Sequence, residues 1–187
     1  MITAGVIWLA AGKFETVEYG SEIKVIGVVS DTHIPSRGRS LPAQLFRLFE
    51  KVQLILHAGD IVEEQVIDDL EALAPVEAVA GNMDPIRLRN HLGRYKLIRL
   101  GDVSIGLLHG DFGGRSLNYD RAKAIFRPEK PQAIVFGHIH EPVAKEVKGT
   151  LFFNPGSAVD PRRDSQPSCG RLLVDGTGVS AEILSIE

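Results

Sequence analysis

Five short apolar runs between residues 24 and 140 each lead directly into a cluster of Asp, His, Asn and Gly. The runs have the β-branched character of strands that are buried on both faces of a sheet. They are 24–30, 53–57, 76–80, 103–109 and 132–136. Helical periodicity lies between several of them, at 41–52, 62–73 and 118–126. Strands that alternate with helices predict an α/β domain with right-handed crossovers.

The last third of the chain has a different pattern. Strand-like runs follow one another there, with turns such as Lys148-Gly149 and Asp175-Gly176 between them, at 143–147, 150–153, 171–174 and 179–186. Short turns between consecutive strands favour a second, mainly antiparallel sheet. We therefore expect two packed sheets flanked by helices in one domain over residues 23–187. Residues 1–22 fit less well, as an edge strand, a loose extension or a misassigned start, and we assign this N-terminal extension no function.

Composition excludes several classes of protein. Of the 187 residues, 44% are hydrophobic and 24% are charged, which is typical of a globular domain and not of a disordered, collagen-like or coiled-coil chain. A net charge of -3 argues against a stable nucleic-acid partner. The single cysteine, Cys169, favours a reducing compartment. The apolar stretch Ala4–Ala11 is too short to span a bilayer and lacks the flanks of a signal peptide. We expect a soluble, cytoplasmic protein without a membrane partner.

The polar clusters stand where the apolar runs end, at 30–33 (SDTH), 57–60 (HAGD), 81–84 (GNMD), 109–111 (HGD) and 137–140 (GHIH). Ligands bind at the carboxyl ends of the strands in an open α/β sheet. We therefore expect the five clusters to converge in space. Glycines beside the polar residues would let the backbone turn sharply and approach a bound group closely.

The clusters contain seven candidate metal ligands: Asp31, His33, Asp60, Asn82, His109, His138 and His140. These are nitrogen and oxygen donors without a thiolate, a set that suits Mn, Fe, Zn, Ni or Co. Seven donors are too many for one ion and suit two ions if one carboxylate bridges. Each motif alone has an ordinary structural interpretation; Asp60, for example, could simply cap a helix. Their occurrence together, each after an apolar strand, favours a metal site.

In this order the clusters resemble the calcineurin-like metallophosphoesterase superfamily, whose pattern is D-x-H, G-D, G-N-x-[D/E], H and G-H-x-H. The chain is most similar to the small, single-domain phosphodiesterase branch, over roughly residues 24–187, and Asn154–Ser157 is similar to an N-P-G-S stretch of that branch. The resemblance implies a two-sheet αββα sandwich. It also implies a hydrolase that acts on phosphoric ester bonds, most of all phosphodiesters.

The resemblance also implies roles for the seven ligands. One ion would be bound by Asp31, His33, Asp60 and His140, Asp60 would bridge, and the second ion would be completed by Asn82, His109 and His138. Two divalent ions, Mn first and otherwise Ni, Fe, Zn or Co, would convert a bridging water to hydroxide and clamp the phosphate oxygens. The expected catalytic residues are Asp60, Asn82, Asp84 and His109.

One position departs from the family pattern. Many superfamily members have a histidine directly after the Asn, where it assists the leaving group, and this chain has Met83. Methionine can neither donate a proton nor stabilise the leaving group's charge. The leaving group is then good enough unaided, or another residue helps. Asp84 either takes that part or orients His109, and we favour the second alternative.

Further residues and partners follow with less weight. Arg37, Arg39 and Arg115 follow metal clusters and could bind the substrate phosphate. His57 is expected in the core or behind the ligands, and His91 in solvent. The partner is a small phosphate ester, with cyclic nucleotides, other diesters and nucleic-acid ends as candidate substrates. Relatives in this branch often form homodimers or homotetramers.

The main alternative is a protein-interaction scaffold on the same fold. The retromer subunit of this fold is similar in length and in its Asp-x-His-Ile-Pro opening, here Asp31–Pro35. Such scaffolds have lost part of the ligand set, whereas all seven positions carry a competent donor here. That difference favours the enzyme. The acidic balance and the lack of a basic stripe disfavour a nucleic-acid-binding module.

Overall fold

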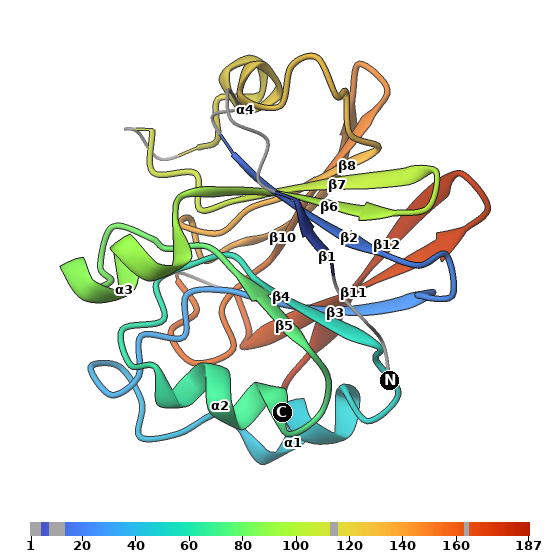
Figure 1. Cartoon of the computed structure of the whole chain (residues 1–187). Helices are drawn as coiled ribbons and strands as arrows, with labels where there is room; N and C mark the ends of the chain where they lie inside the picture. Colours follow the sequence, from blue (N-terminus) through green and yellow to red (C-terminus); the bar gives the residue numbers. More distant parts are fainter. Residues whose placement is uncertain (1–4, 8–13, 113–115, 163–164) are drawn as a thin grey trace.

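The computed structural model describes residues 5–7, 14–112, 116–162 and 165–187. Two β-sheets pack face to face, with α1 and α2 below one sheet and α4 above the other in Figure 1. The expected two-sheet αββα sandwich is therefore confirmed.

The larger sheet has seven strands in the order β1-β2-β6-β7-β8-β10-β9. Their bounds are β1 Gly5–Ile7, β2 Glu15–Tyr19, β6 Tyr95–Leu100, β7 Val103–Leu108, β8 Ala133–Val135, β9 Pro142–Val147 and β10 Thr150–Pro155. β8 runs parallel to both of its neighbours, β7 and β10. The β7 and β8 carboxyl ends therefore lie at one edge of this sheet.

The smaller sheet has five strands in the order β12-β11-β3-β4-β5. Their bounds are β3 Val25–Val29, β4 Leu54–His57, β5 Val76–Ala78, β11 Ser168–Asp175 and β12 Gly178–Ser185. β3, β4 and β5 are parallel to one another, and β11 and β12 form an antiparallel hairpin. The antiparallel pairing expected in the last third is confirmed by this hairpin and by β9 with β10. The expectation that these strands form a second sheet of their own is wrong, because β9 and β10 extend the larger sheet beside β8, whereas β11 and β12 extend the smaller sheet beside β3.

The hydrophobic core forms three layers. One cluster lies between the two sheets and contains Ile26, Leu56 and Val135 among others. A second lies between the smaller sheet and α1 (Ala43–Leu48), α2 (Gln65–Glu71) and α3 (Ile86–Leu92). The third packs α4 (Tyr119–Ile125) on the larger sheet. The sandwich thus buries both faces of the parallel strands, as their apolar runs predict.

Two helices are shorter than their periodicity predicts. α2 begins at Gln65 rather than at Val62, because the backbone N–H groups of Ile61 and Val62 bond to a distant side chain, Asp84, and Val62 has a left-handed φ of 77°. α1 ends at Leu48, before the expected end at Val52. α4 agrees within one residue at each end, and the Asn118 side chain caps it by accepting a hydrogen bond from Arg121 N at 2.9 Å.

Sequence reasoning missed two elements, α3 and β6. α3 had a signal, because Pro85 stands directly before its first residue and Gly93, with φ 69°, directly after its last. β6 (YKLIRL) contains charged residues that obscure the alternation of apolar and polar side chains typical of a strand. It pairs with β7 in an antiparallel hairpin through a turn at Gly101.

The described part of residues 1–22 joins the larger sheet. β2 pairs in parallel with β6, and β1 forms the edge beyond it. Tyr19 on β2 donates its hydroxyl to Glu77 Oε1 at 2.8 Å, and Lys96 reaches the other carboxylate oxygen at 2.8 Å. Because Glu77 lies on β5, this network ties the edge strand of the smaller sheet to β2 and β6 of the larger sheet.

Among the described residues, no helix has the length and apolarity that crossing a membrane requires.

Candidate metal centre

The candidate ligands lie on loops that follow parallel strands in both sheets. Asp31 and His33 follow β3, Asp60 follows β4, and Asn82 follows β5. From the larger sheet, His109 follows β7, while His138 and His140 follow β8. The expected convergence of carboxyl strand ends therefore occurs at one end of the sandwich.

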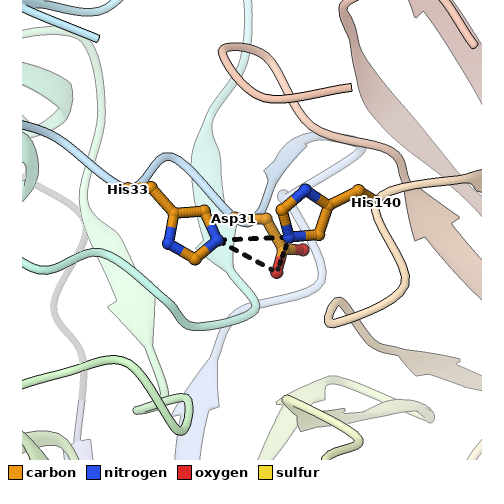
Figure 2. A group of neighbouring side chains, drawn as sticks. All are labelled: Asp31, His33 and His140. Atoms are coloured by element: carbon orange, nitrogen blue, oxygen red, sulfur yellow. Dashed lines mark hydrogen bonds and ion pairs between the residues drawn. The ribbon is translucent and has the colours of Figure 1, made fainter. Parts of the chain in front are cut away.

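Asp31, His33 and His140 form the first tight group of donors (Figure 2). His140 Nε2 lies 3.3 Å from Asp31 Oδ1 and 3.1 Å from His33 Nε2. His33 Nε2 is 3.9 Å from the same Asp31 oxygen. All three residues are buried. Two donors from the loop after β3 thus face one from the loop after β8, with His33 and His140 separated by 107 positions in the sequence.

Asp31, Asp60 and His109 form the second group, also buried. His109 Nε2 lies 3.3 Å from Asp60 Oδ2, and that same oxygen lies 3.6 Å from His33 Nε2 of the first group. Asn82 Oδ1 is 3.2 Å from His109 Nε2. Asp60 therefore lies between the two groups.

Hydrogen bonds to backbone carbonyls orient the His109 and His140 rings so that Nε2 points at the carboxylates. The Nδ1 atom of His109 is 2.8 Å from the carbonyl oxygen of Ala58, and that of His140 is 2.5 Å from the carbonyl oxygen of Asp160. Because a carbonyl oxygen only accepts, each Nδ1 carries the proton and donates it. Each Nε2 therefore faces a carboxylate oxygen, where a neutral ring offers a lone pair to a cation and a protonated ring donates a hydrogen bond to the carboxylate. Such an arrangement of neutral rings and carboxylates fits a cation between them.

The electrostatics agree with a cation site. Burial alone raises the pKa of the Asp31 carboxyl, but hydrogen bonding to His140 and the charges of His109 and His140 outweigh burial and hold this pKa below its ordinary value. Burial lowers the pKa of His109, yet the bond to Asp60 and the two carboxylate charges raise it to about 9. The pocket around His109 Nε2 thus favours positive charge strongly.

The backbone of the ligand loops is unusual. Five candidate ligands have left-handed φ angles between 48° and 71°, namely Asp31, His33, Asp60, His138 and His140. Residues other than glycine adopt this region rarely, and it costs conformational energy. The loops are held by direct bonds, such as the one from His138 N to Asp31 Oδ2 at 3.0 Å.

Two glycines allow the loops to meet. A Cβ on Gly81 would overlap the Asp60 carboxylate and lie 2.6 Å from Asp60 N. A Cβ on Gly59, which has φ 92°, would lie 2.9 Å from His109 Nδ1. Both positions therefore need glycine for close approach, as the glycine-flanked clusters predict.

The favoured expectation for Asp84, that it orients His109, is wrong. His109 Nδ1 bonds to Ala58 instead. The Asp84 side chain is buried and accepts four backbone N–H bonds of 2.6–3.1 Å, from Asp60, Ile61, Val62 and Gly81. Burial raises its pKa, against the effect of these bonds. Because its oxygens accept hydrogen bonds from these amides, Asp84 ties the Asp60 and Asn82 loops together, and none of these contacts supports the expectation that Asp84 is catalytic.

The other predicted residues lie around the two groups. The His138 ring is edge-on to His109, with centroids 5.2 Å apart, and is partly exposed, outside both tight groups. Arg37 is exposed, with Nε 3.8 Å from Asp160 Oδ2, and Arg39 is exposed as well. Arg115 lies outside the described residues.

His57 lies fully buried behind the ligands, as expected. Gly59 N donates to His57 Nδ1 at 3.2 Å, so the Nε2–H donates to Thr32 Oγ1 at 3.2 Å. Burial lowers the pKa of His57 to about 3, and the ring is neutral.

Sequence reasoning missed the support given by residues 154–160. Ser157 Oγ donates to the Asp31 carbonyl at 2.7 Å and accepts from Asp160 N at 2.8 Å. The buried Asn154 side chain donates to the Gly137 carbonyl at 2.8 Å. The N-P-G-S stretch thus holds the β3 and β8 loops. The match of Asn154–Ser157 to the family pattern marked this stretch in the sequence, but it did not indicate what these residues do.

Comparison with known proteins agrees with this geometry. A family model described as the calcineurin-like phosphoesterase superfamily domain matches residues 25–177. A probable metallophosphoesterase from Methanothermobacter thermautotrophicus is 37% identical over 164 residues, which cover 86% of this chain and 91% of the relative. A phosphodiesterase from Methanocaldococcus jannaschii is 27% identical over 145 residues, covering 70% of this chain and 82% of the relative.

Among solved structures, the crystal structure of Vps29 from Entamoeba histolytica complexed with Zn²⁺ superposes with a TM-score of 0.67 at 27% identity. The match covers 86% of this chain and 98% of that protein. The fold is thus shared with a protein that has been crystallised with a divalent metal.

Proposed function

Because this chain belongs to the calcineurin-like phosphoesterase superfamily, we propose that it is a metal-dependent phosphodiesterase with a dinuclear centre. The observation that carries the proposal is the orientation of His109 and His140. Both rings donate Nδ1–H to a backbone carbonyl and turn Nε2, the atom that a metal would bind, toward a buried carboxylate.

The donor set supports two ions. Asp60 has one oxygen within 3.6 Å of imidazole nitrogens from both groups, which is where a bridging ligand belongs. The ions would be held by Asp31, His33, Asp60, Asn82, His109, His138 and His140. We propose Mn as the metal, with Ni, Fe, Zn or Co as alternatives, because the donors are nitrogen and oxygen without thiolate. When bound, two such ions supply a water of lowered pKa and positive charge for the phosphate oxygens.

The chain's own residues position this chemistry. Asp84 fixes the Asp60 loop through backbone N–H bonds, and Asp160 fixes the tautomer of His140. The exposed Asn82 stands at the open side of the centre, where its amide can reach a substrate phosphate. The protein would hydrolyse a diester to a phosphomonoester and an alcohol. We further propose a cytoplasmic location, because the lone Cys169 is buried and free.

The decisive experiment is hydrolysis of a chromogenic phosphodiester by metal-stripped protein, with Mn, Ni, Zn, Co and Mg added back separately. We expect a transition metal to restore activity, and His109→Ala to reduce kcat by about 100-fold or more, because the second group loses a donor. The matched control is His91→Ala, an exposed histidine outside both groups, which should keep full activity. Metal binding without hydrolysis in wild type, or full activity in His109→Ala, would contradict the proposal.

Position 83, occupied by Met83, is where we expect assistance to the leaving group to be decided. Its side chain is 59% exposed, and its backbone N–H donates to Asp60 Oδ1 at 2.7 Å, so position 83 is anchored to the centre. We expect Met83→His to raise kcat/KM by about tenfold or more on esters with poor leaving groups, through proton donation, and little on good ones. The measurement is kcat/KM across a leaving-group series. The control is Ile86→His, exposed on α3; an equal gain in both variants would refute the role of position 83.

The second candidate function is a protein-interaction scaffold. It is favoured by the structural similarity to Vps29, whose full name, vacuolar protein sorting 29, assigns it to protein sorting. The complete donor set argues for the enzyme instead. If metal-stripped protein neither binds the added ions nor hydrolyses any diester, the result would favour the scaffold function over the enzyme.

A further inference from the structure

A cavity lies far from the metal centre, at the opposite end of the larger sheet. Its volume is about 530 Å³, and it is lined by α4, the segment that connects α4 to β8, and the β9–β10 turn. These elements lie at the top of the view in Figure 1. β8 and β10 begin at this cavity, whereas His138 and His140 follow the end of β8. Pro131 precedes His138 by seven residues, so about 20 Å separates the two sites.

The cavity is strongly basic. Four cationic side chains line it, Lys123, Arg127, Lys130 and Lys148, against one carboxylate, Asp120. A net charge of +3 is thus gathered in one concave site of a chain whose net charge is -3. Like charges at this density repel one another, and an anion in the cavity would relieve that repulsion.

The four cationic side chains differ in whether their charges are neutralised within the protein. Lys148 Nζ bonds to Asp120 at 2.8 Å, which neutralises one of them. Lys123 Nζ donates to the backbone carbonyl of Lys148 at 2.9 Å, which fixes its ammonium at the wall and leaves its charge uncompensated. Arg127 and Lys130 are exposed and form no ion pair within the described part of the chain. Three positive charges are therefore available to a ligand.

The cavity also has an apolar side. Pro131 and Thr150 are buried and line it, together with Pro128. The volume lies within the range of small-molecule sites, which combine an apolar lining with a few charged groups. A ligand that fits both features carries several negative charges on one part and a flat or apolar body on another.

From this geometry we propose a second ligand site between α4 and the β9–β10 turn that binds a small polyphosphate with an apolar body, of the nucleoside diphosphate class. Arg127 and Lys130 bind its phosphate oxygens, and Pro128 and Pro131 contact its apolar part. This site is separate from the metal centre and does not depend on the proposed hydrolysis.

The test is calorimetric titration of the full chain with α,β-methylene-ADP, a probe that resists hydrolysis. We expect Arg127→Ala/Lys130→Ala to weaken binding about tenfold or more, because two charge-assisted contacts are lost. The matched control is Arg47→Ala/Lys51→Ala, which removes two exposed cations outside the cavity and should bind as wild type does. Asp60→Asn should also bind as wild type does, since the metal centre is not involved.

Several results would overturn the site. Equal affinity of wild type and Arg127→Ala/Lys130→Ala would do so, as would the absence of binding to wild type or equal binding of adenosine without phosphates. A loss of affinity in Asp60→Asn would assign the probe to the metal centre instead. Hydrolysis of the chromogenic diester should be the same in Arg127→Ala/Lys130→Ala as in wild type, so the outcome is read separately from the proposed function.

Discussion

Asp60→Asn is expected to reduce kcat for phosphodiester hydrolysis by about 100-fold or more and to weaken the binding of both ions. The physical reason is the position of the carboxylate. Its Oδ2 lies 3.3 Å from His109 and 3.6 Å from His33, one from each donor group. An amide there has the same shape but no charge, so both groups lose the anion that they share. Activity assays with metal titration followed by calorimetry measure the two effects together.

The control for Asp60→Asn is Asp102→Asn, which makes the same change in charge at an exposed position in the β6–β7 turn. It should leave kcat and the metal stoichiometry unchanged. Circular dichroism should show that both variants are folded. Near-normal turnover in Asp60→Asn, or the loss of only one ion with the other bound as tightly as before, would refute the bridging role.

Asp84→Ala is expected to lower the free energy of unfolding by about 3 kcal/mol or more. The carboxylate is buried and receives four backbone N–H groups, two on each oxygen. Removing it leaves these donors without an acceptor in the protein. Urea denaturation, with the midpoint compared at constant m-value, measures the loss. Metal affinity should fall as well, because the Asp60 and Asn82 loops lose their common tie.

The matched control for Asp84→Ala is Asp111→Ala. Asp111 is a partly buried carboxylate two residues after His109, and it forms an ion pair with the half-exposed Arg94 at 2.6 Å. Its removal should cost about 1 kcal/mol or less. If the free energy of unfolding falls equally in both variants, the four hydrogen bonds from backbone amides to Asp84 do not stabilise the fold as proposed.

The strands and most of the candidate ligands could be predicted because each depends on local signals. Apolar runs identify β3, β4, β5, β7 and β8 within a few residues of their observed ends. The residues directly after them are carried to the carboxyl ends of parallel strands, and those ends share one edge. Convergence of Asp31, Asp60, His109 and His140 follows from that rule.

The start of α2 and the role of Asp84 could not be predicted, because both depend on contacts across more than twenty residues. Periodicity places the helix start at Val62, but the amides of Ile61 and Val62 bond to Asp84 instead. From sequence, Asp84 offers a carboxylate beside Asn82, which is compatible with proton transfer or with orienting His109. Only the folded chain reveals that four backbone amides occupy it.

Residue order was therefore enough to predict the α/β class, the edge at which the polar clusters meet and the types of donor atom available there, since these follow from strand periodicity and side-chain chemistry. The tertiary structure alone decided the rest. It set which ring nitrogen of His109 and His140 faces the carboxylates, through the carbonyls of Ala58 and Asp160. It also gathered Lys123, Arg127, Lys130 and Lys148 around one cavity. The physical reason is that hydrogen-bond direction and charge density depend on distances between distant segments, which packing sets and residue order does not.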